Sequence, residues 1–98
     1  DPLEEILDVY EEDGAEVLGR LEQAAADGDA EAVRRCAHRL KGSSANVGAK
    51  GLADRLARIE RAAPAGVTEA VRAEVQQVRA LFAPTLAALR AYSPNVSR

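Results

Sequence analysis

Apolar residues recur every three or four positions along almost the whole chain, and this spacing constrains the fold more than any other feature of the sequence. An α-helix gathers residues at that spacing on one face, whereas a half-buried strand needs strict alternation. The chain has no alternating β-branched run and no Asn-Gly hairpin signal. Its 98 residues suffice for one small core. The sequence therefore predicts an all-α domain.

Two breaks interrupt the apolar spacing in the first third of the chain. Asp13 followed by Glu16 has the spacing of a capping box, so we expect a short N-terminal helix before Asp13 and a second helix after it. Gly28 can end that second helix in a left-handed conformation, and Asp29 can cap the next one.

Further breaks divide the rest of the chain. Gly48 marks the turn after a helix expected over about 30–46. The next helix is expected over about 49–62, and the Ala-Pro-Ala-Gly loop follows it. The last helix begins near residue 67 and contains Pro84, which removes one backbone hydrogen bond. We therefore expect this helix to be kinked or split.

The expected architecture is an antiparallel up-down four-helix bundle with a short additional N-terminal helix. It covers residues 1–92, and residues 93–98 form a polar tail. Because the chain begins at Asp1 and contains no methionine, we expect it to be one domain of a longer protein.

The charge and cysteine content exclude several classes of function. The net charge is −3 and both signs are interspersed, which argues against a nucleic-acid-binding face. The single cysteine, Cys36, excludes an internal disulfide and a multi-cysteine metal site. No run of 18 apolar residues is present. We expect a cytoplasmic monomer that binds neither nucleic acid nor membrane and holds no cofactor or metal.

The helix expected over 30–46 carries the only histidine, His38. Small and apolar side chains recur on one face of this helix at steps of three and four residues, and we expect this face, called the seam, to point into the core. Its residues are Val33, Ala37, Leu40, Ser44 and Val47. His38 lies at the edge of that seam, partly packed and partly in water. Lys41 and Gly42 follow on the same side one turn later.

These three residues together suit attack on an anionic group. An unperturbed imidazole has a pKa of about 6.5, so near pH 7 it offers a neutral nucleophilic nitrogen. Lys41 would stabilise phosphoryl oxygens. Gly42 weakens a helix interior by up to about 1 kcal/mol but leaves a hollow beside the ring. Ordinary alternatives exist for each: a boundary histidine, a solvated lysine and a glycine selected for helix packing.

The stretch AHRLKGSSANVGAKGLADRLARIE resembles the histidine-containing phosphotransfer (Hpt) domain of two-component phosphorelays. The pattern is Ala-His-x-Leu-Lys-Gly, then small residues, a turn glycine and a helix ending in Leu-Glu or similar. The matching residues are Ala37, His38, Leu40, Lys41, Gly42, Ser43, Ser44, Asn46, Gly48, Leu52, Leu56 and Glu60. Val47 and Ile59 stand where leucine is common, and Pro84 is not a family signature.

The resemblance implies that His38 accepts a phosphoryl group through Nε2 from an aspartyl phosphate on a receiver domain. His38 would then pass it to another receiver's aspartate. Lys41 would hold phosphate oxygens, and Glu60 matches a position where a Gln or Glu hydrogen-bonds the imidazole. Receivers would dock on Gly42, Ser43, Ala45, Arg39 and Arg34. The Mg²⁺ would belong to the receiver, so the domain would be a carrier and not an enzyme.

Exposed apolar side chains near the N-terminus, Ile6, Val9 and Tyr10, are expected to add docking contacts. Two other functions compete with phosphotransfer. One is a helical adaptor bundle without phosphotransfer. The other is the dimerising phosphoacceptor domain of a histidine kinase, in which the residue after the histidine is usually acidic, whereas Arg39 stands here.

Overall fold

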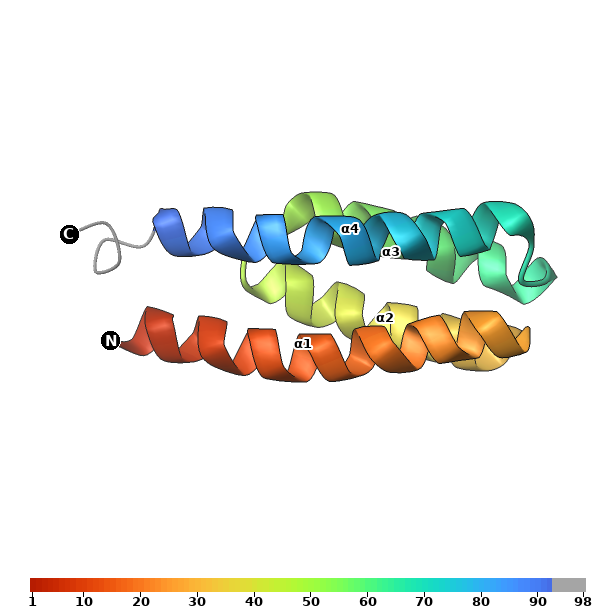
Figure 1. The fold of residues 1–98 in the computed structure, drawn as a ribbon, viewed down its shortest axis with the longest axis horizontal. Helices are drawn as coiled ribbons and strands as arrows, with labels where there is room; N and C mark the ends of the chain where they lie inside the picture. Colours follow the sequence, from red (N-terminus) through yellow and green to blue (C-terminus); the bar gives the residue numbers. More distant parts are fainter. Residues whose placement is uncertain (93–98) are drawn as a thin grey trace.

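The structure is a computed structural model that describes residues 1–92, and the polar tail predicted at 93–98 lies outside the described residues. The described part has no strand. Its elements are α1 (Pro2–Asp27), α2 (Ala30–Asn46), α3 (Lys50–Ala62), the 3-10 helix η1 (Ala63–Ala65) and α4 (Glu69–Ala91). The four α-helices run up and down around one core, which confirms the predicted all-α four-helix bundle (Figure 1).

The N-terminal segment differs from the prediction, because α1 is one unbroken helix and no separate short helix precedes Asp13. The helix starts after Asp1, whose carboxylate accepts a hydrogen bond from the Glu4 amide. Asp13 lies in mid-helix, and its Oδ1 is 3.0 Å from Nη2 of Arg39 on α2. Its carboxylate therefore binds across the helix interface, and the predicted cap at Asp13 is wrong.

Gly14 lies inside the continuous helix α1. Its lack of a side chain leaves room for a side chain of α4 to pack against α1. A Cβ at Gly14 would come within 2.9 Å of the Phe82 ring of α4. Tyr10 packs on the same ring, with centroids 5.5 Å apart, and its hydroxyl is 2.8 Å from the buried Oγ of Ser44. Burial raises the pKa of Tyr10. Tyr10 therefore belongs to the core and not to an exposed docking surface.

The other helix ends follow local signals. Gly28 has a φ of 69° and ends α1, and Asp29 caps α2 by accepting a hydrogen bond from a backbone amide. Thr68 caps α4 in the same way, a signal that the sequence prediction missed. Pro84 lies on the exposed side of α4, which is continuous from Glu69 to Ala91, so of the predicted kink or split the split is wrong.

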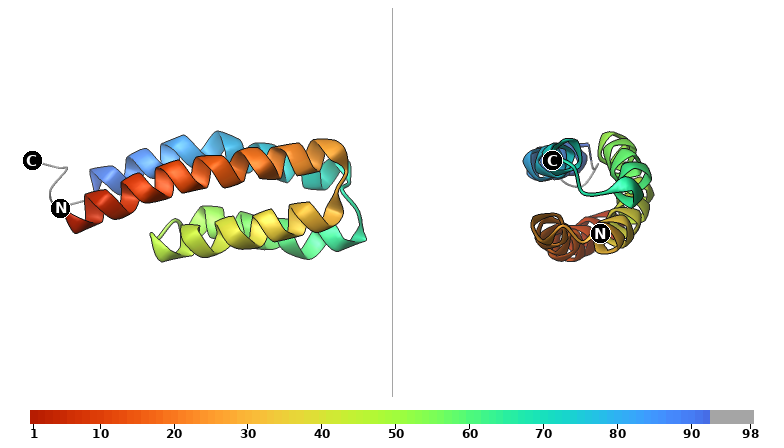
Figure 2. Two further views of the ribbon diagram at one scale, coloured as in Figure 1. Left: turned by 90° about the horizontal axis from the view of Figure 1, so that it is seen from below. Right: turned by 90° about the vertical axis from the view of Figure 1, so that its right-hand side faces the viewer.

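Each α-helix packs against two neighbours: α1 and α3 both contact α2 and α4 (Figure 2). α1 and α4 extend past the α2–α3 turn at the end of the bundle where α1 begins and α4 ends (Figures 1 and 2). The core is mostly aliphatic and includes Leu7, Val17, Leu18, Leu21, Val33, Ala37, Leu40, Leu52, Leu56, Ile59, Val71, Val75, Val78, Phe82 and Leu86. The middle of α2 is thereby fixed, with one face in the core and the other in solvent.

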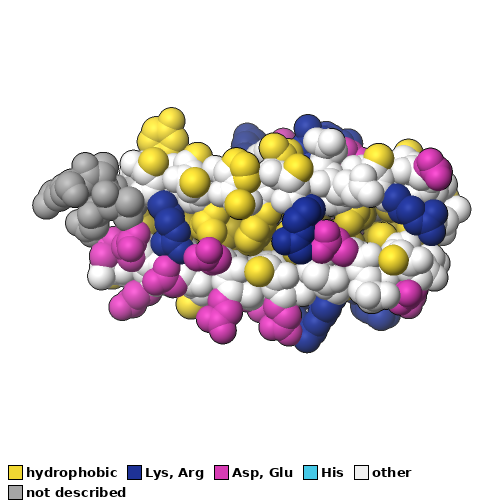
Figure 3. All heavy atoms as spheres, viewed as in Figure 1, with side chains coloured by type: hydrophobic (Ala, Val, Ile, Leu, Met, Phe, Trp, Pro, Cys, Tyr) yellow, Lys and Arg dark blue, Asp and Glu magenta, His cyan; other side chains and the backbone are white. Residues whose placement is uncertain are grey.

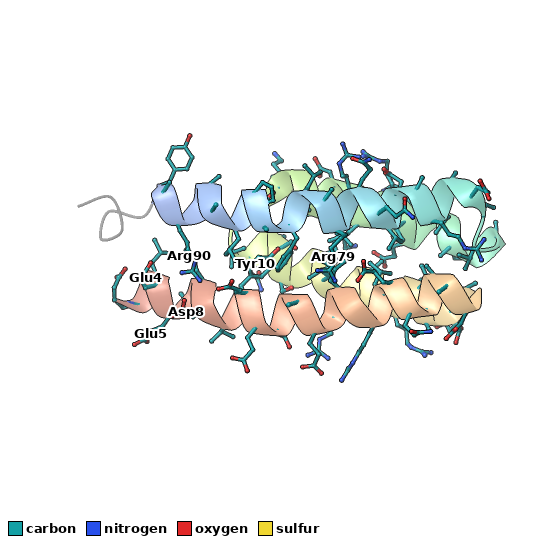
Figure 4. All side chains as sticks on the ribbon, viewed as in Figure 1. Glu4, Glu5, Asp8, Tyr10, Arg79 and Arg90 are labelled. Carbon is teal, nitrogen blue, oxygen red and sulfur yellow. The ribbon has the colours of Figure 1, made fainter. Side chains whose placement is uncertain are left out.

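Ion pairs border the α1–α4 seam, where basic side chains of α4 reach across apolar surface to acidic ones of α1 (Figure 3). Arg90 lies within 2.9 Å of carboxylate oxygens of both Asp8 and Glu11, and Arg79 pairs with Glu22. Figure 4 shows Arg79 and Arg90 of α4 pointing toward α1. The hydrogen bonds that Arg79 donates to the Glu22 carboxylate lower the pKa of Glu22. Partly exposed pairs contribute little each, about 1 kcal/mol or less.

Candidate functional site

His38 lies on the solvent-facing side of α2, at the edge of the inward-facing seam, as the sequence predicts. Val33, Ala37, Leu40 and Ser44 are buried and Val47 is half-buried, so the seam is confirmed. His38 lies beside it, and its side chain is 64% exposed. The imidazole is therefore accessible from solvent, and its Nδ1 is 2.8 Å from Oε2 of Glu60 on α3.

Glu60 holds two partners at once. Its Oε2 contacts the His38 ring, and its Oε1 is 2.6 Å from Nζ of Lys41. The burial of Ile59 in the core turns the next residue, Glu60, toward the edge of the α2–α3 interface. The hydrogen bond from Lys41, and then the one from His38, lowers the pKa of Glu60. Glu60 is therefore an ionised carboxylate that accepts from both side chains.

This contact decides which ring nitrogen of His38 is free. An ionised carboxylate can only accept hydrogen bonds, so Nδ1 of the neutral ring must be the donor to Glu60. The lone pair then lies on Nε2, the nitrogen without a hydrogen-bond partner among residues 1–92. The arrangement presents an oriented nucleophilic nitrogen to solvent, with a cation attached to the same carboxylate.

Replacing Lys41 with Met is expected to raise the pKa of Glu60 toward its ordinary value of 4.5, because the Lys41 hydrogen bond is the largest cause of the lowered pKa. The stabilisation that depends on ionised Glu60 is present above the unfolded-state pKa and is lost as the pH falls through the lowered folded-state pKa. Carboxyl chemical shifts followed by NMR titration measure the change. An unchanged Glu60 titration in the Lys41→Met variant would contradict this account.

Gly42 is not required by packing. A Cβ built at Gly42 meets no heavy atom within 4 Å, in contrast to Gly14. The residue is exposed in the interior of α2 and has no positive φ. The alternative that helix packing selects this glycine is therefore wrong. Ala45 is also exposed and lies one turn after Gly42. No large side chain therefore projects from these two positions beyond His38.

The other predicted docking residues lie around the ring on α2, but both arginines have acidic partners. Arg39 pairs with Asp13 of α1, and Arg34 makes two hydrogen bonds to Glu31, one turn earlier on α2. Ser43 is half-buried, and its hydroxyl donates to backbone carbonyls of its own helix. Arg39 and Ser43 therefore border α1, whereas Arg34 pairs within α2, so the predicted docking residues lie on different sides of His38 and not on one face of the helix.

An apolar groove of about 190 Å³ lies between α1 and α2. Its lining comprises Ile6, Val9, Tyr10, Asp13, Ser43, Asn46 and Val47. Ile6 and Val9 are exposed, as predicted, whereas Tyr10 contributes only from the core side. The sequence analysis did not identify Asp13 and Asn46 as lining residues of this groove. The groove forms only where α1 packs beside α2, so its lining depends on tertiary structure.

Two kinds of feature are absent from residues 1–92. No group of three or more His, Cys, Asp or Glu side chains is placed to hold a metal ion. In the same part of the chain, no helix has the length and apolar character needed to cross a membrane. Cys36 is a free, half-buried thiol whose pKa is raised by burial.

Comparison with protein families gives a match to the Hpt domain over residues 5–91, from the first turns of α1 to the end of α4. The chain belongs to the Hpt domain family. Hpt domains are histidine phosphotransfer carriers of two-component phosphorelays, and they interact with receiver domains. Searches of curated proteins and of solved structures gave no match.

Membership of the Hpt family confirms the resemblance found in the sequence. In this Hpt domain, all four α-helices of one chain close the core, so the helical-hairpin dimer of a histidine kinase does not fit the fold. Glu60 binds Lys41 as well as the His38 ring that the resemblance implies as its partner. The structure has both contacts on one carboxylate.

Proposed function

We propose that this Hpt domain carries a phosphoryl group on Nε2 of His38. The group arrives from an aspartyl phosphate of one receiver domain and leaves to the aspartate of another. The observation that carries the proposal is the exposed His38 ring, whose Nδ1 is 2.8 Å from an ionised carboxylate. This contact leaves Nε2 as the free nucleophile.

The transfer step needs no proton movement at the ring. The Nε2 lone pair forms a bond to phosphorus while the bond from phosphorus to the aspartyl oxygen breaks, and the carboxylate leaves with that electron pair. Nδ1 keeps its proton, so the ring gains a positive charge, and Oε2 of Glu60 stabilises it. The reverse step, onto a second receiver's aspartate, returns the ring to its neutral form.

Lys41 is the cation for the phosphoryl oxygens. Its ammonium is bound to the carboxylate that also contacts the His38 ring, so the positive charge already lies beside the reacting nitrogen. The lysine stem is flexible, and the ammonium can exchange Glu60 for a phosphoryl oxygen by rotating about its own bonds. Glu60 then remains with the charged ring alone.

Docking of the receiver would centre on the hollow at Gly42 and extend over Ser43, Ala45 and the apolar groove that Ile6 and Val9 line. Arg39 and Arg34 supply positive charge around an acidic receiver pocket. The Mg²⁺ of that pocket is the receiver's. The domain, a unit over residues 1–92, would act as a monomeric cytoplasmic carrier that catalyses no turnover alone.

Replacing Glu60 with Ala is expected to slow transfer about tenfold, because the ring loses the acceptor that orients Nδ1. Glu60→Gln keeps an acceptor oxygen but no negative charge, so its rate should lie between those of Glu60→Ala and the wild type. Single-turnover transfer from a phosphorylated receiver gives the rates. A Glu60→Ala rate equal to the wild-type rate would remove Glu60 from the mechanism.

The function is tested by adding radiolabelled phosphorylated receiver domains to the chain. Label on the wild type and none on a His38 variant supports phosphotransfer. A helical adaptor would bind receivers and acquire no label. Binding without transfer, measured by calorimetry alongside the labelling, would therefore favour the adaptor function.

A further inference from the structure

A second cation lies beside His38 on α2 and is absent from the transfer step described above. Arg34 is one turn before His38 on the same helix, and residues four apart share a face. Its guanidinium binds Glu31 through two hydrogen bonds, with Nε–Oε2 at 3.1 Å and Nη2–Oε1 at 2.6 Å. The Arg34 side chain is 38% exposed, so solvent reaches it.

Arg34 lies on the Glu60 side of the helix. The hydrogen bonds that Arg34 donates to Glu31 raise the pKa of Arg34 most, and the charge of Glu60 adds to the same effect. Glu60 contacts both His38 and Lys41. The guanidinium is therefore within electrostatic range of the carboxylate that holds the reacting ring.

The neighbouring arginine faces the other way. Arg35 lines a groove toward α1, together with Val17, Arg20, Cys36 and Arg39. It is 3.8 Å from Glu31, more distant than Arg34, and its side chain is 64% exposed. Arg34 and Arg35 thus share the helix, the charge and the acidic neighbour Glu31, but Arg35 lines the groove toward α1 and Arg34 does not.

We propose that Arg34 is a second phosphoryl-binding cation and that it exchanges Glu31 for phosphoryl oxygens when Nε2 of His38 attacks. This inference rests on the proposed function. A phosphoryl group in transfer spreads negative charge over three oxygens, and a guanidinium can donate two parallel hydrogen bonds to them. Arg34 and Lys41, on opposite sides of the ring along α2, would then bind different oxygens.

Glu31 has a defined part in this exchange. In the resting structure it neutralises Arg34 and holds the guanidinium in a bidentate pair. It competes with the incoming phosphoryl group for the same donors. Removing the Glu31 charge should therefore speed phosphorylation, but only while Arg34 is present.

Phosphoramidate, a small donor that needs no docking surface, separates phosphoryl binding from receiver docking. Nε2 forms its bond to phosphorus as the nitrogen–phosphorus bond of the donor breaks. Ammonia leaves with the electron pair, since the donor reacts with its nitrogen already protonated. Phosphorus NMR follows phosphohistidine formation on wild type, Arg34→Gln, Arg35→Gln, Glu31→Gln and the double variant of Glu31→Gln with Arg34→Gln.

We expect Arg34→Gln to slow phosphorylation about fivefold, and Arg35→Gln to change it by less than about twofold. Glu31→Gln should speed the reaction about twofold, and the double variant should react at the Arg34→Gln rate. Circular dichroism checks that every variant keeps the helical fold.

Equal rates for Arg34→Gln and Arg35→Gln would overturn the inference and leave phosphotransfer by His38 intact. A Glu31→Gln gain that persists without Arg34 would also overturn it, because Glu31 would then act by general repulsion. If the wild-type chain forms no phosphohistidine, the proposed function itself fails.

Discussion

Replacing His38 with Gln is expected to abolish phosphotransfer while leaving the bundle folded. His38 is the only histidine, and a Gln side chain offers an amide nitrogen without a nucleophilic lone pair. The wild-type ring is largely exposed, and Glu60 would keep its second partner, Lys41. The free energy of unfolding should therefore change by less than about 1 kcal/mol.

The measurement combines label uptake from a phosphorylated receiver with thermal unfolding of the same samples. Arg35→Gln is the control, because it also places a Gln side chain on α2 but at a position that lines the groove toward α1. Equal uptake of label by the His38 variant and the wild type would end the assignment of His38 as the phosphoacceptor.

Replacing Gly42 with Gln is expected to slow transfer from a receiver about 30-fold or more. The added side chain would project from the exposed surface of α2 into the hollow beside His38, where the receiver must approach. Stability should not fall, because Gln favours a helix interior over Gly by about 0.5–1 kcal/mol and the side chain meets no neighbour. The variant should thus be more stable and less active.

Two controls make this result specific. Gly19→Gln adds the same side chain at an exposed helical position of α1 that also has open space around a Cβ, and it should leave transfer unchanged. Phosphoramidate should phosphorylate the Gly42 variant at the wild-type rate, because a small donor does not dock. A Gly42 variant with the wild-type rate of transfer from the receiver would show that the hollow is not a docking surface.

The helix with the site was predictable from local signals. Gly28 and Asp29 set the start of α2, and its end at Asn46 agrees with the predicted end. The seam spacing placed His38 correctly at the edge of the core. These features depend on residues that are close in sequence, so the local spacing of apolar and capping residues is enough to predict them.

The continuity of α1 was not predictable in the same way. Asp13 has capping-box spacing to Glu16, but its carboxylate binds Arg39 on another helix. Gly14 looks like a helix breaker, yet it is the residue that lets Phe82 approach α1. Both roles come from tertiary contacts, which a reading of local propensity does not include.

At the site, sequence reasoning paired Glu60 with the imidazole through the family resemblance. It did not establish that the same carboxylate binds Lys41, because that depends on how α3 is rotated against α2. The Glu31–Arg34 pair did have a local signal, since three-residue spacing on a helix favours an ion pair. That signal was overlooked.

The most direct test of the account is to identify which ring nitrogen of His38 bears phosphorus. Because the chain has one histidine, isotope labelling of its imidazole nitrogens gives a single pair of signals. After phosphorylation, NMR should detect phosphorus coupled to Nε2 and a proton on Nδ1. Phosphorus on Nδ1, or on a residue other than His38, would contradict an imidazole oriented by Glu60 for attack through Nε2.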